Sequence, residues 1–221
     1  MSNIDFQSQI SNRYLSIDFL KGFIILLMTF VNTMAYFDLT PTWTRHADVY
    51  GLTYVDLIAP CFIFLLVINF HLSYEKRIKY DSKIKVFRHF IIRNLILLAL
   101  GLILYIDVSG SQLQLRWGTL QYIASTGFII LLCVRLPKTI RLIIGIIGMF
   151  IYQIFLLPPY RVIIYNSIEG GIIGIISWAS IGLLSSFLAT GLIKNTHKDV
   201  KLYFLYFGLI ILFFGKIVRI S

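Results

Sequence analysis

The sequence predicts an all-α bundle of transmembrane helices. Hydrophobic residues make up 58% of the 221 residues and charged residues only 14%. This hydrophobic share is well above that of water-soluble domains. The apolar runs are about 20 residues long, which is the length that an α-helix needs to cross a bilayer. Because lipid offers the backbone no hydrogen bonds, runs of this length favour helices over the strands of a barrel. We therefore expect an integral membrane protein.

About seven apolar segments follow one another along the chain. The first is too long for the core of a signal peptide and lacks a small-residue cleavage site, so we expect a retained helix. The connections are short, and no polar stretch is long enough to fold alone, so residues 1–221 are expected to form a single transmembrane domain. The expected spans are about 15–37, 54–74, 86–106, 118–135, 139–157, 170–193 and 202–220.

The distribution of Lys and Arg predicts the side of the membrane on which each connection lies. With the N-terminus inside, 13 of these cations fall on the cytoplasmic side and 5 on the opposite side. Cytoplasmic loops of membrane proteins carry the excess of positive charge, so we predict a cytoplasmic N-terminus. The cytoplasmic cations are then Arg13, Lys76, Arg77, Lys79, Lys83, Lys85, Arg88, Arg135, Lys138, Arg141, Lys194, Lys198 and Lys201.

Composition and motif content argue against several classes of protein. The net charge of +10 could indicate a nucleic-acid partner, but the basic residues occupy short gaps between apolar runs, so we expect none. The chain has no glycine-rich phosphate loop, no His-Glu-x-x-His motif and no Gly-x-Ser-x-Gly elbow. Their absence disfavours ATP-coupled and metal-dependent hydrolysis, and no metal is expected. Small residues at four-residue spacing in 170–193 predict a close helix contact and are compatible with a homodimer.

Two charged residues lie close together within the first segment. Asp18 and Lys21 are three residues apart, which places them on one face of a helix, where they can neutralise each other. An ionisable group at membrane depth needs a partner, a water-filled cavity or a chemical role. Two interpretations stay open: a structural ion pair, or a site that receives an anionic ligand from the cytoplasm.

Three polar residues are expected at one level near the outer surface. Asn32 ends the first segment, His46 lies in the connection and Asp56 begins the second segment, so the short connection makes them neighbours. A carboxylate fixes the tautomer of an imidazole and raises its basicity, which suits general-base or nucleophilic catalysis. A loop histidine taken alone is more often solvated than catalytic. Gln121, at the outer start of the fourth segment, could join the same cavity or form an interhelical hydrogen bond.

Three stretches of the sequence resemble one family of membrane enzymes. The first is Arg13-Tyr-Leu-Ser-Ile-Asp-Phe-Leu-Lys-Gly22, followed by Met28 and Val31-Asn32. His46 then precedes Gly51-Leu-Thr-Tyr-Val-Asp56-Leu-Ile-Ala-Pro60, and a later stretch reads Arg116-Trp-Gly-Thr-Leu-Gln121-Tyr-Ile-Ala. Together they resemble the catalytic region of the heparan-α-glucosaminide N-acetyltransferase family, most closely over residues 13–125.

The resemblance implies a polytopic enzyme that takes acetyl-CoA from the cytoplasm and delivers its acetyl group to an amino sugar across the membrane. A cytoplasmic donor needs an entrance beside Asp18 and Lys21, where Arg13 and the basic connections attract the phosphates of CoA. Under this resemblance we also expect Gln121 to contribute to binding of the acetyl-CoA donor. The family's active histidine precedes the Gly-Leu-Thr-x-x-Asp segment, and His46 occupies that position.

The leading hypothesis is therefore an N- or O-acetyltransferase that uses acetyl-CoA, or another acyl-CoA, to modify a sugar or glycan outside the cytoplasm. His46 is the expected base or nucleophile, Asp56 orients it and Asn32 binds a polar reaction centre. The expected location is the cytoplasmic membrane of a prokaryote. One alternative is a non-enzymatic transporter subunit that uses the same polar groups as a substrate or proton pathway. Another is a structural membrane partner with a degenerate site.

Overall fold

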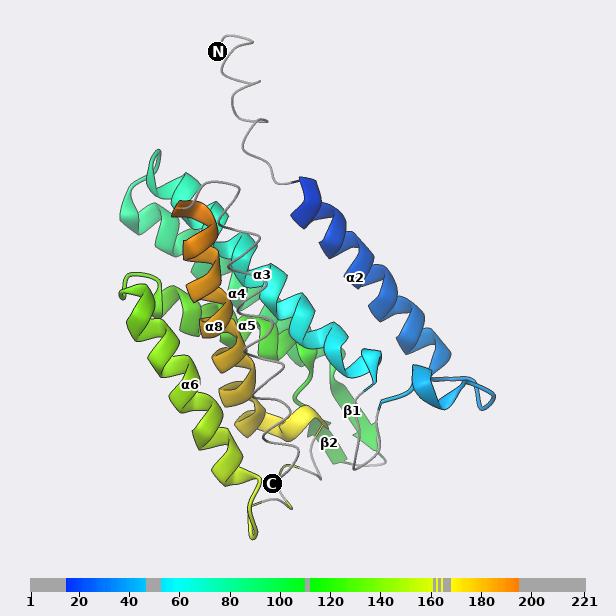
Figure 1. Ribbon diagram of the computed structural model, residues 1–221. Helices are drawn as coiled ribbons and strands as arrows, with labels where there is room; N and C mark the ends of the chain where they lie inside the picture. Colours follow the sequence, from blue (N-terminus) through cyan, green and yellow to red (C-terminus); the bar gives the residue numbers. More distant parts are fainter. Residues whose placement is uncertain are drawn as a thin grey trace. The chain divides into compact units, whose positions relative to one another are not determined.

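A computed structural model of the chain describes residues 15–46, 53–109, 112–160, 162, 164 and 168–194. Two compact units form, Met1–Leu66 and Val67–Ser221, and the division between them falls inside a helix. The described α-helices are α2 (Leu15–Met34), α3 (Tyr54–Ile78), α4 (Lys83–Leu104), α5 (Thr119–Cys133), α6 (Lys138–Phe155) and α8 (Gly174–Lys194), with short 3₁₀ helices η1 (Thr42–Thr44) and η2 (Ile168–Ile173) (Figure 1). The prediction of a helical membrane protein is confirmed for this part of the chain.

Five of the helical segments in the described ranges are long and apolar enough to cross a membrane. They are α2, α3, α4, α6 and the segment Gly170–Gly191 that contains most of α8. The fourth expected span is shorter than predicted, because α5 has only 15 residues. At 1.5 Å per residue it measures about 22 Å, less than the roughly 30 Å of a bilayer's hydrocarbon core. The seventh expected span, 202–220, lies outside the described residues.

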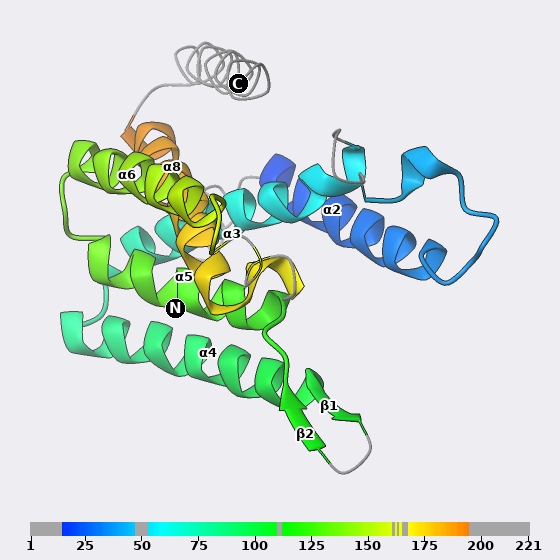
Figure 2. The same cartoon turned by 90° about the horizontal axis from the view of Figure 1, so that it is seen from below.

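A two-stranded antiparallel hairpin joins α4 to α5 and departs from the all-α prediction (Figure 2). Strand β1 (Ile106–Ser109) pairs with β2 (Gln112–Leu115), so that Ile106 lies opposite Leu115. The amide of Arg116 extends the ladder by donating to the Tyr105 carbonyl at 3.0 Å. Gly118 follows at the start of α5, where an added Cβ would overlap the Tyr105 ring. This close approach explains why a glycine stands in the Arg116–Ala124 stretch.

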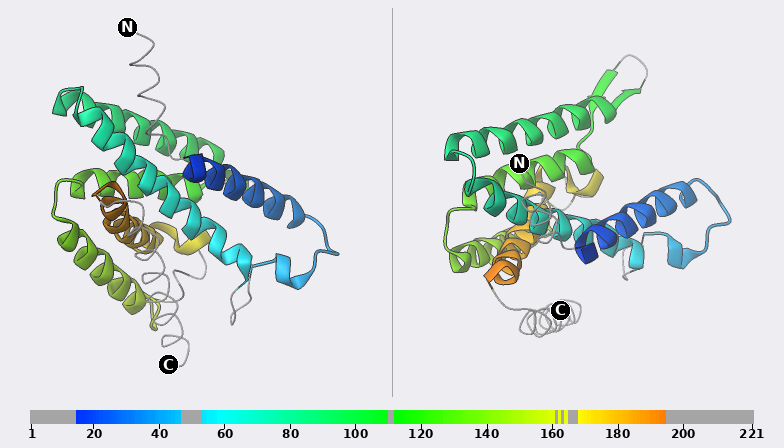
Figure 3. Two further views of the ribbon diagram at one scale, coloured as in Figure 1. Left: turned by 45° about the horizontal axis from the view of Figure 1, so that its top comes forward. Right: turned by 90° about the horizontal axis from the view of Figure 1, so that it is seen from above.

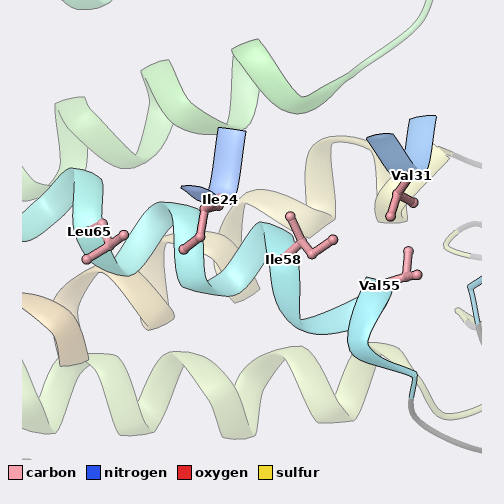
Figure 4. Close-up of a cluster of buried hydrophobic side chains, with 5 residues drawn as sticks. All are labelled: Ile24, Val31, Val55, Ile58 and Leu65. Carbon is pink, nitrogen blue, oxygen red and sulfur yellow. The ribbon is translucent and has the colours of Figure 1, made fainter. Parts of the chain in front are cut away.

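The first unit is held by one apolar seam between α2 and the beginning of α3. Ile24 and Val31 of α2 share a buried cluster with Val55, Ile58 and Leu65 of α3 (Figure 4). Residues seven apart, such as the two on α2, lie on the same helical stripe. The seam brings the end of α2 close to the start of α3, which are the two ends of the connection that contains His46.

In the second unit, α4 packs against α5, α5 against α8, and α8 against α6 (Figures 2 and 3). Small residues allow α8 to approach α5 and α6 closely. A Cβ added at Gly182 would lie 2.6 Å from Cγ2 of Thr126 in α5. A Cβ added at Gly145 of α6 would lie 3.2 Å from both the Leu183 Cβ and the Ser180 carbonyl oxygen of α8. The close helix contact predicted for 170–193 is therefore confirmed at Gly182.

The turn between α3 and α4 is closed by local polar contacts. Ser82 caps α4, and its hydroxyl accepts a hydrogen bond from the Lys85 amide at 3.4 Å. Asp81 pairs with Lys85 at 2.8 Å, and this contact lowers the pKa of the Asp81 carboxyl group. Tyr80, 80% exposed, projects from the same turn.

Candidate active site

In the connection between α2 and α3, side chains hydrogen-bond to nearby backbone carbonyls and hold the segment up to residue 46. The Thr40 hydroxyl reaches the Met34 carbonyl at 2.6 Å, and the Arg45 guanidinium donates to the Asp38 carbonyl at 2.6 Å. Thr44, in η1, is buried. Because side chains and backbone both hold this turn, the backbone immediately before His46 has a defined path.

His46 and Asp56 form a direct hydrogen bond. The distance between Nδ1 of His46 and Oδ1 of Asp56 is 2.8 Å. The side chain of Asp56 is 24% exposed, whereas that of His46 is 76% exposed. The two residues that were expected to be neighbours are therefore joined, with the carboxylate mostly enclosed and the imidazole mostly accessible.

The second carboxylate oxygen of Asp56 holds the start of α3. Oδ2 accepts a hydrogen bond from the Thr53 amide at 2.9 Å. Thr53 is the residue before α3 and Asp56 is three positions further on, which is the arrangement of a capping box with an aspartate. One oxygen thus ties the carboxylate to the backbone, while the other is left for the imidazole. The orientation of Asp56 is set by the helix and not by the histidine alone.

This arrangement defines the chemistry open to His46. An ionised carboxylate can only accept hydrogen bonds, so Nδ1 of His46 carries the proton and Nε2 keeps its lone pair. An accessible Nε2 on an oriented imidazole can accept a proton from a substrate or attack an acyl group. The carboxylate also stabilises the imidazolium that forms in either case.

Thr53 was not singled out from the sequence, although it positions both members of the pair. Its hydroxyl donates to the Arg45 carbonyl at 2.8 Å and lies 3.1 Å from Oδ2 of Asp56. It therefore links the residue before His46 to the start of the helix that carries Asp56. The signal was present as Thr53-x-x-Asp56, a spacing typical of a helix N-terminus.

The remaining residues predicted in the first unit are not joined to this pair. Asn32 is exposed on α2, and the hydrogen bonds between described residues do not connect it to His46 or Asp56. Lys21 and Asp18 form the expected ion pair at 2.7 Å, with side chains 29% and 27% exposed. The ion pair fits either interpretation of these two residues. Arg13 lies outside the described residues.

Gln121 belongs to the second unit, where its side chain contacts backbone. Its Oε1 accepts from the Gly118 amide at 3.2 Å, and its Nε2 donates to the Arg116 carbonyl at 3.2 Å. The side chain is fully buried against Gly101 of α4. These contacts close the junction between the hairpin and α5, so Gln121 has a structural role in addition to any part in donor binding.

One cation was assigned to the wrong environment. Arg141 was counted among the charges of a cytoplasmic connection, but it lies inside α6 and is only 4% exposed. A count of charges weighs every Lys and Arg equally, whether solvent or protein surrounds it, so the environment of Arg141 was not predicted. Within the described ranges, no group of three His, Cys, Asp or Glu residues is arranged to hold a metal ion.

Comparison with known families identifies the family to which this chain belongs. A family model described as heparan-alpha-glucosaminide N-acetyltransferase, catalytic, matches residues 13–215. The match includes His46, Thr53 and Asp56, and it reaches well beyond residue 125, where the similarity read from the sequence ended. No curated protein matches the chain. The match covers nearly all of the 221 residues, and the chain belongs to the heparan-alpha-glucosaminide N-acetyltransferase catalytic family.

Proposed function

We propose that this chain is a membrane-bound acetyltransferase in which the His46–Asp56 pair is the reacting centre. The donor is acetyl-CoA in the cytoplasm, and the acceptor is an amino or hydroxyl group of a sugar or glycan on the outer side. The observation that carries the proposal is the 2.8 Å contact between Nδ1 of His46 and Oδ1 of Asp56 in a chain of this acetyltransferase family. A pathway of buried polar groups, as in a transporter, does not require an accessible, carboxylate-oriented imidazole.

The proposed reaction moves one acetyl group and one proton. The acceptor nitrogen or oxygen bonds to the thioester carbonyl carbon, and the bond between that carbon and the sulfur of CoA breaks. Nε2 of His46 takes the proton from the acceptor and returns it to the leaving thiolate, so CoA departs as a thiol. In the two-step version, Nε2 carries the acetyl group between donor and acceptor. In both versions Asp56 stabilises the charged imidazole.

The other predicted residues have supporting roles in this proposal. Asn32 supplies an amide that binds a polar group at the reaction centre. Lys21, held by Asp18 at 2.7 Å, contributes positive charge at the donor entrance, together with Arg13. Because the phosphates of CoA are anionic, charge-assisted hydrogen bonds from such cations are a suitable means of binding them.

The experiment that tests the proposed function is acetyl transfer by the purified full-length protein in detergent. Acetyl-CoA is supplied with glucosamine or a matched sugar that lacks the amino group, and released CoA thiol and acetylated sugar are measured together. The proposal expects equal amounts of thiol and acetylated product, and the comparison of sugars distinguishes N- from O-transfer. A folded protein that releases no thiol with any sugar acceptor would overturn the proposed function.

A further inference from the structure

A cavity of about 410 Å³ lies in the second unit, between the end of α3, the start of α6 and the end of α8. His71 and Glu75 of α3, Lys138 and Arg141 of α6, and Thr190 of α8 line it. These helix ends all belong to the side of the membrane that is predicted to be cytoplasmic. The cavity has no part in the proposed chemistry of His46.

Arg141 is the buried cation of this cavity, and its hydrogen-bond partners are neutral groups. One terminal nitrogen, Nη1, contacts Nε2 of His71 at 3.0 Å and donates to the Ser186 hydroxyl oxygen. The other, Nη2, donates to the Thr190 hydroxyl oxygen at 2.7 Å. The three partners fix the plane of the guanidinium but bring no negative charge.

The positive charge of Arg141 lacks a direct counter-ion in the described part of the chain. No carboxylate there forms an ion pair with it, and its Nε has no hydrogen-bond partner among the described residues. Glu75 interacts with it electrostatically from a greater distance. A buried cation without a paired anion is costly, because the low-dielectric surroundings do not replace its hydration. An anion bound in the cavity would offset this cost.

Two further groups at the same cavity favour an anion. Lys138, an exposed residue, lines the cavity. It is the first residue of the 18-residue helix α6, which follows Pro137 without a side-chain cap. The first amides of a helix have no intrahelical acceptor, and the helix dipole places partial positive charge there. Helix N-termini of this kind bind phosphate groups.

We propose that this cavity is a phosphate-binding site, with Arg141, Lys138 and the N-terminus of α6 as its ligands. A phosphate group suits the site because it offers several acceptor oxygens to a planar guanidinium, an ammonium group and helix amides at once. The phosphate belongs to a CoA molecule, to a lipid headgroup or to free phosphate, and the binding chemistry is the same for all three. The inference stands on the second unit alone and does not rest on the proposed function of His46.

Calorimetric titration of the purified full-length protein with inorganic phosphate and with CoA tests the site. Lys138→Gln is expected to weaken binding about tenfold, because one charge-assisted hydrogen bond is lost. Lys79→Gln is the matched control, since this exposed lysine does not line the cavity, and it is expected to leave the affinity unchanged. To test a lipid headgroup, the melting temperature of the protein is measured in nanodiscs with and without phosphatidylglycerol. The ligand that shows the Lys138-dependent effect identifies the source of the phosphate.

Glu75→Gln distinguishes the proposal from an internal counter-ion. If an external phosphate neutralises Arg141, removing the repulsive carboxylate should tighten phosphate binding severalfold and leave the protein folded. If Glu75 is the true counter-ion, the same variant should lower the melting temperature, and none of the three ligands should show binding that depends on Lys138. That second result would overturn the proposal.

Discussion

At the scale of single residues, Asp56 serves two structures at once. One oxygen holds the start of α3 through the Thr53 amide, and the other holds the imidazole of His46. A carboxylate that is already fixed by a helix loses little freedom when it orients a histidine, which is the pre-organisation that catalytic pairs need. The same division means that substitutions at this position affect both the helix and the histidine.

Replacing Asp56 with Asn should separate these two effects. The amide oxygen can still accept from the Thr53 amide, so the start of α3 is kept, but the amide NH₂ then faces Nδ1 of His46. The imidazole is forced into the other tautomer, with the proton on Nε2, where it can no longer act as a base. We expect the transfer rate to fall roughly 100-fold or more, as in other His–Asp pairs.

The double variant provides the check on this interpretation. Residues that act as a unit are non-additive, so Asp56→Asn combined with His46→Ala should be little slower than His46→Ala alone. Rates measured at saturating acetyl-CoA for the four proteins complete the cycle. Fully additive losses would show that the two side chains act separately.

A second prediction at this scale concerns Lys21. Lys21→Glu places two carboxylates three residues apart and reverses the charge at the proposed donor entrance. We expect CoA binding to weaken by about 1–3 kcal/mol if a charge-assisted hydrogen bond is lost. Lys79→Glu makes the same charge change at an exposed position and is the control for a general effect of net charge. Unchanged CoA affinity in folded Lys21→Glu would assign the Asp18–Lys21 pair to structure only.

At the scale of elements, the close contacts of α8 depend on small residues at the positions where its neighbours cross. Gly182 leaves room for Thr126 of α5, whereas Gly22 of α2 has nothing within 4 Å of the position a Cβ would take. Valine and glycine differ by only a few tenths of a kcal/mol in helix propensity, so a Gly→Val exchange isolates the steric effect.

Gly182→Val should therefore lower the free energy of unfolding by about 1–3 kcal/mol, the usual cost of overpacking a well-filled contact. Gly22→Val, the matched control, should stay within about 0.5 kcal/mol of the parent protein, as expected for a site without packing constraints. Denaturant-induced unfolding in detergent measures both variants. Equal effects of the two substitutions would contradict the proposed close approach of α8 and α5.

Helix positions were predictable from the sequence because a run of apolar residues has one stable form in lipid. The predicted edges were displaced where polar residues continue a helix: α3 extends to Ile78, past the predicted end at 74, because Glu75, Lys76 and Arg77 keep the helical backbone beyond the apolar run. The hairpin at Ile106–Leu115 was missed because it falls between two apolar runs and is short. Its alternating sequence, Gln112-Leu-Gln-Leu115, was the available signal.

The candidate site was predictable to the same limited extent. The proximity of His46 and Asp56 followed from a short connection between two helices, and the structure joins them; their catalytic role stays a prediction. Thr53 and the neutral partners of Arg141 were not predicted. Such contacts depend on how loops close and on which helices become neighbours. A hydropathy pattern predicts neither of these.

At the scale of the whole molecule, the proposed transfer requires the two sides of the membrane to have different roles. The positive-inside rule places the connection of His46 outside and the turn between α3 and α4 in the cytoplasm. Single cysteines in a background without Cys61 and Cys133 test this orientation. Leu39, 97% exposed, and Tyr80, 80% exposed, are suitable positions, whereas Thr44 is buried.

Leu39→Cys should react with an impermeant thiol reagent added outside intact cells, and Tyr80→Cys should react only after the membrane is opened. Both residues lie in turns, so neither substitution is expected to change helix packing. Mass-shift labelling of the two variants measures the outcome. Labelling of both positions from one side would contradict the predicted topology.

The most direct test of the central claim is the rate of acetyl transfer in a single turnover by folded His46→Ala protein, measured together with its affinity for CoA. His89→Ala is the matched control, because His89 is an exposed histidine on α4 with no part in the proposed chemistry. We predict that His46→Ala slows acetyl transfer roughly 100-fold or more while CoA binding is kept, and that His89→Ala retains both. Normal acetyl transfer by folded His46→Ala protein would contradict this prediction.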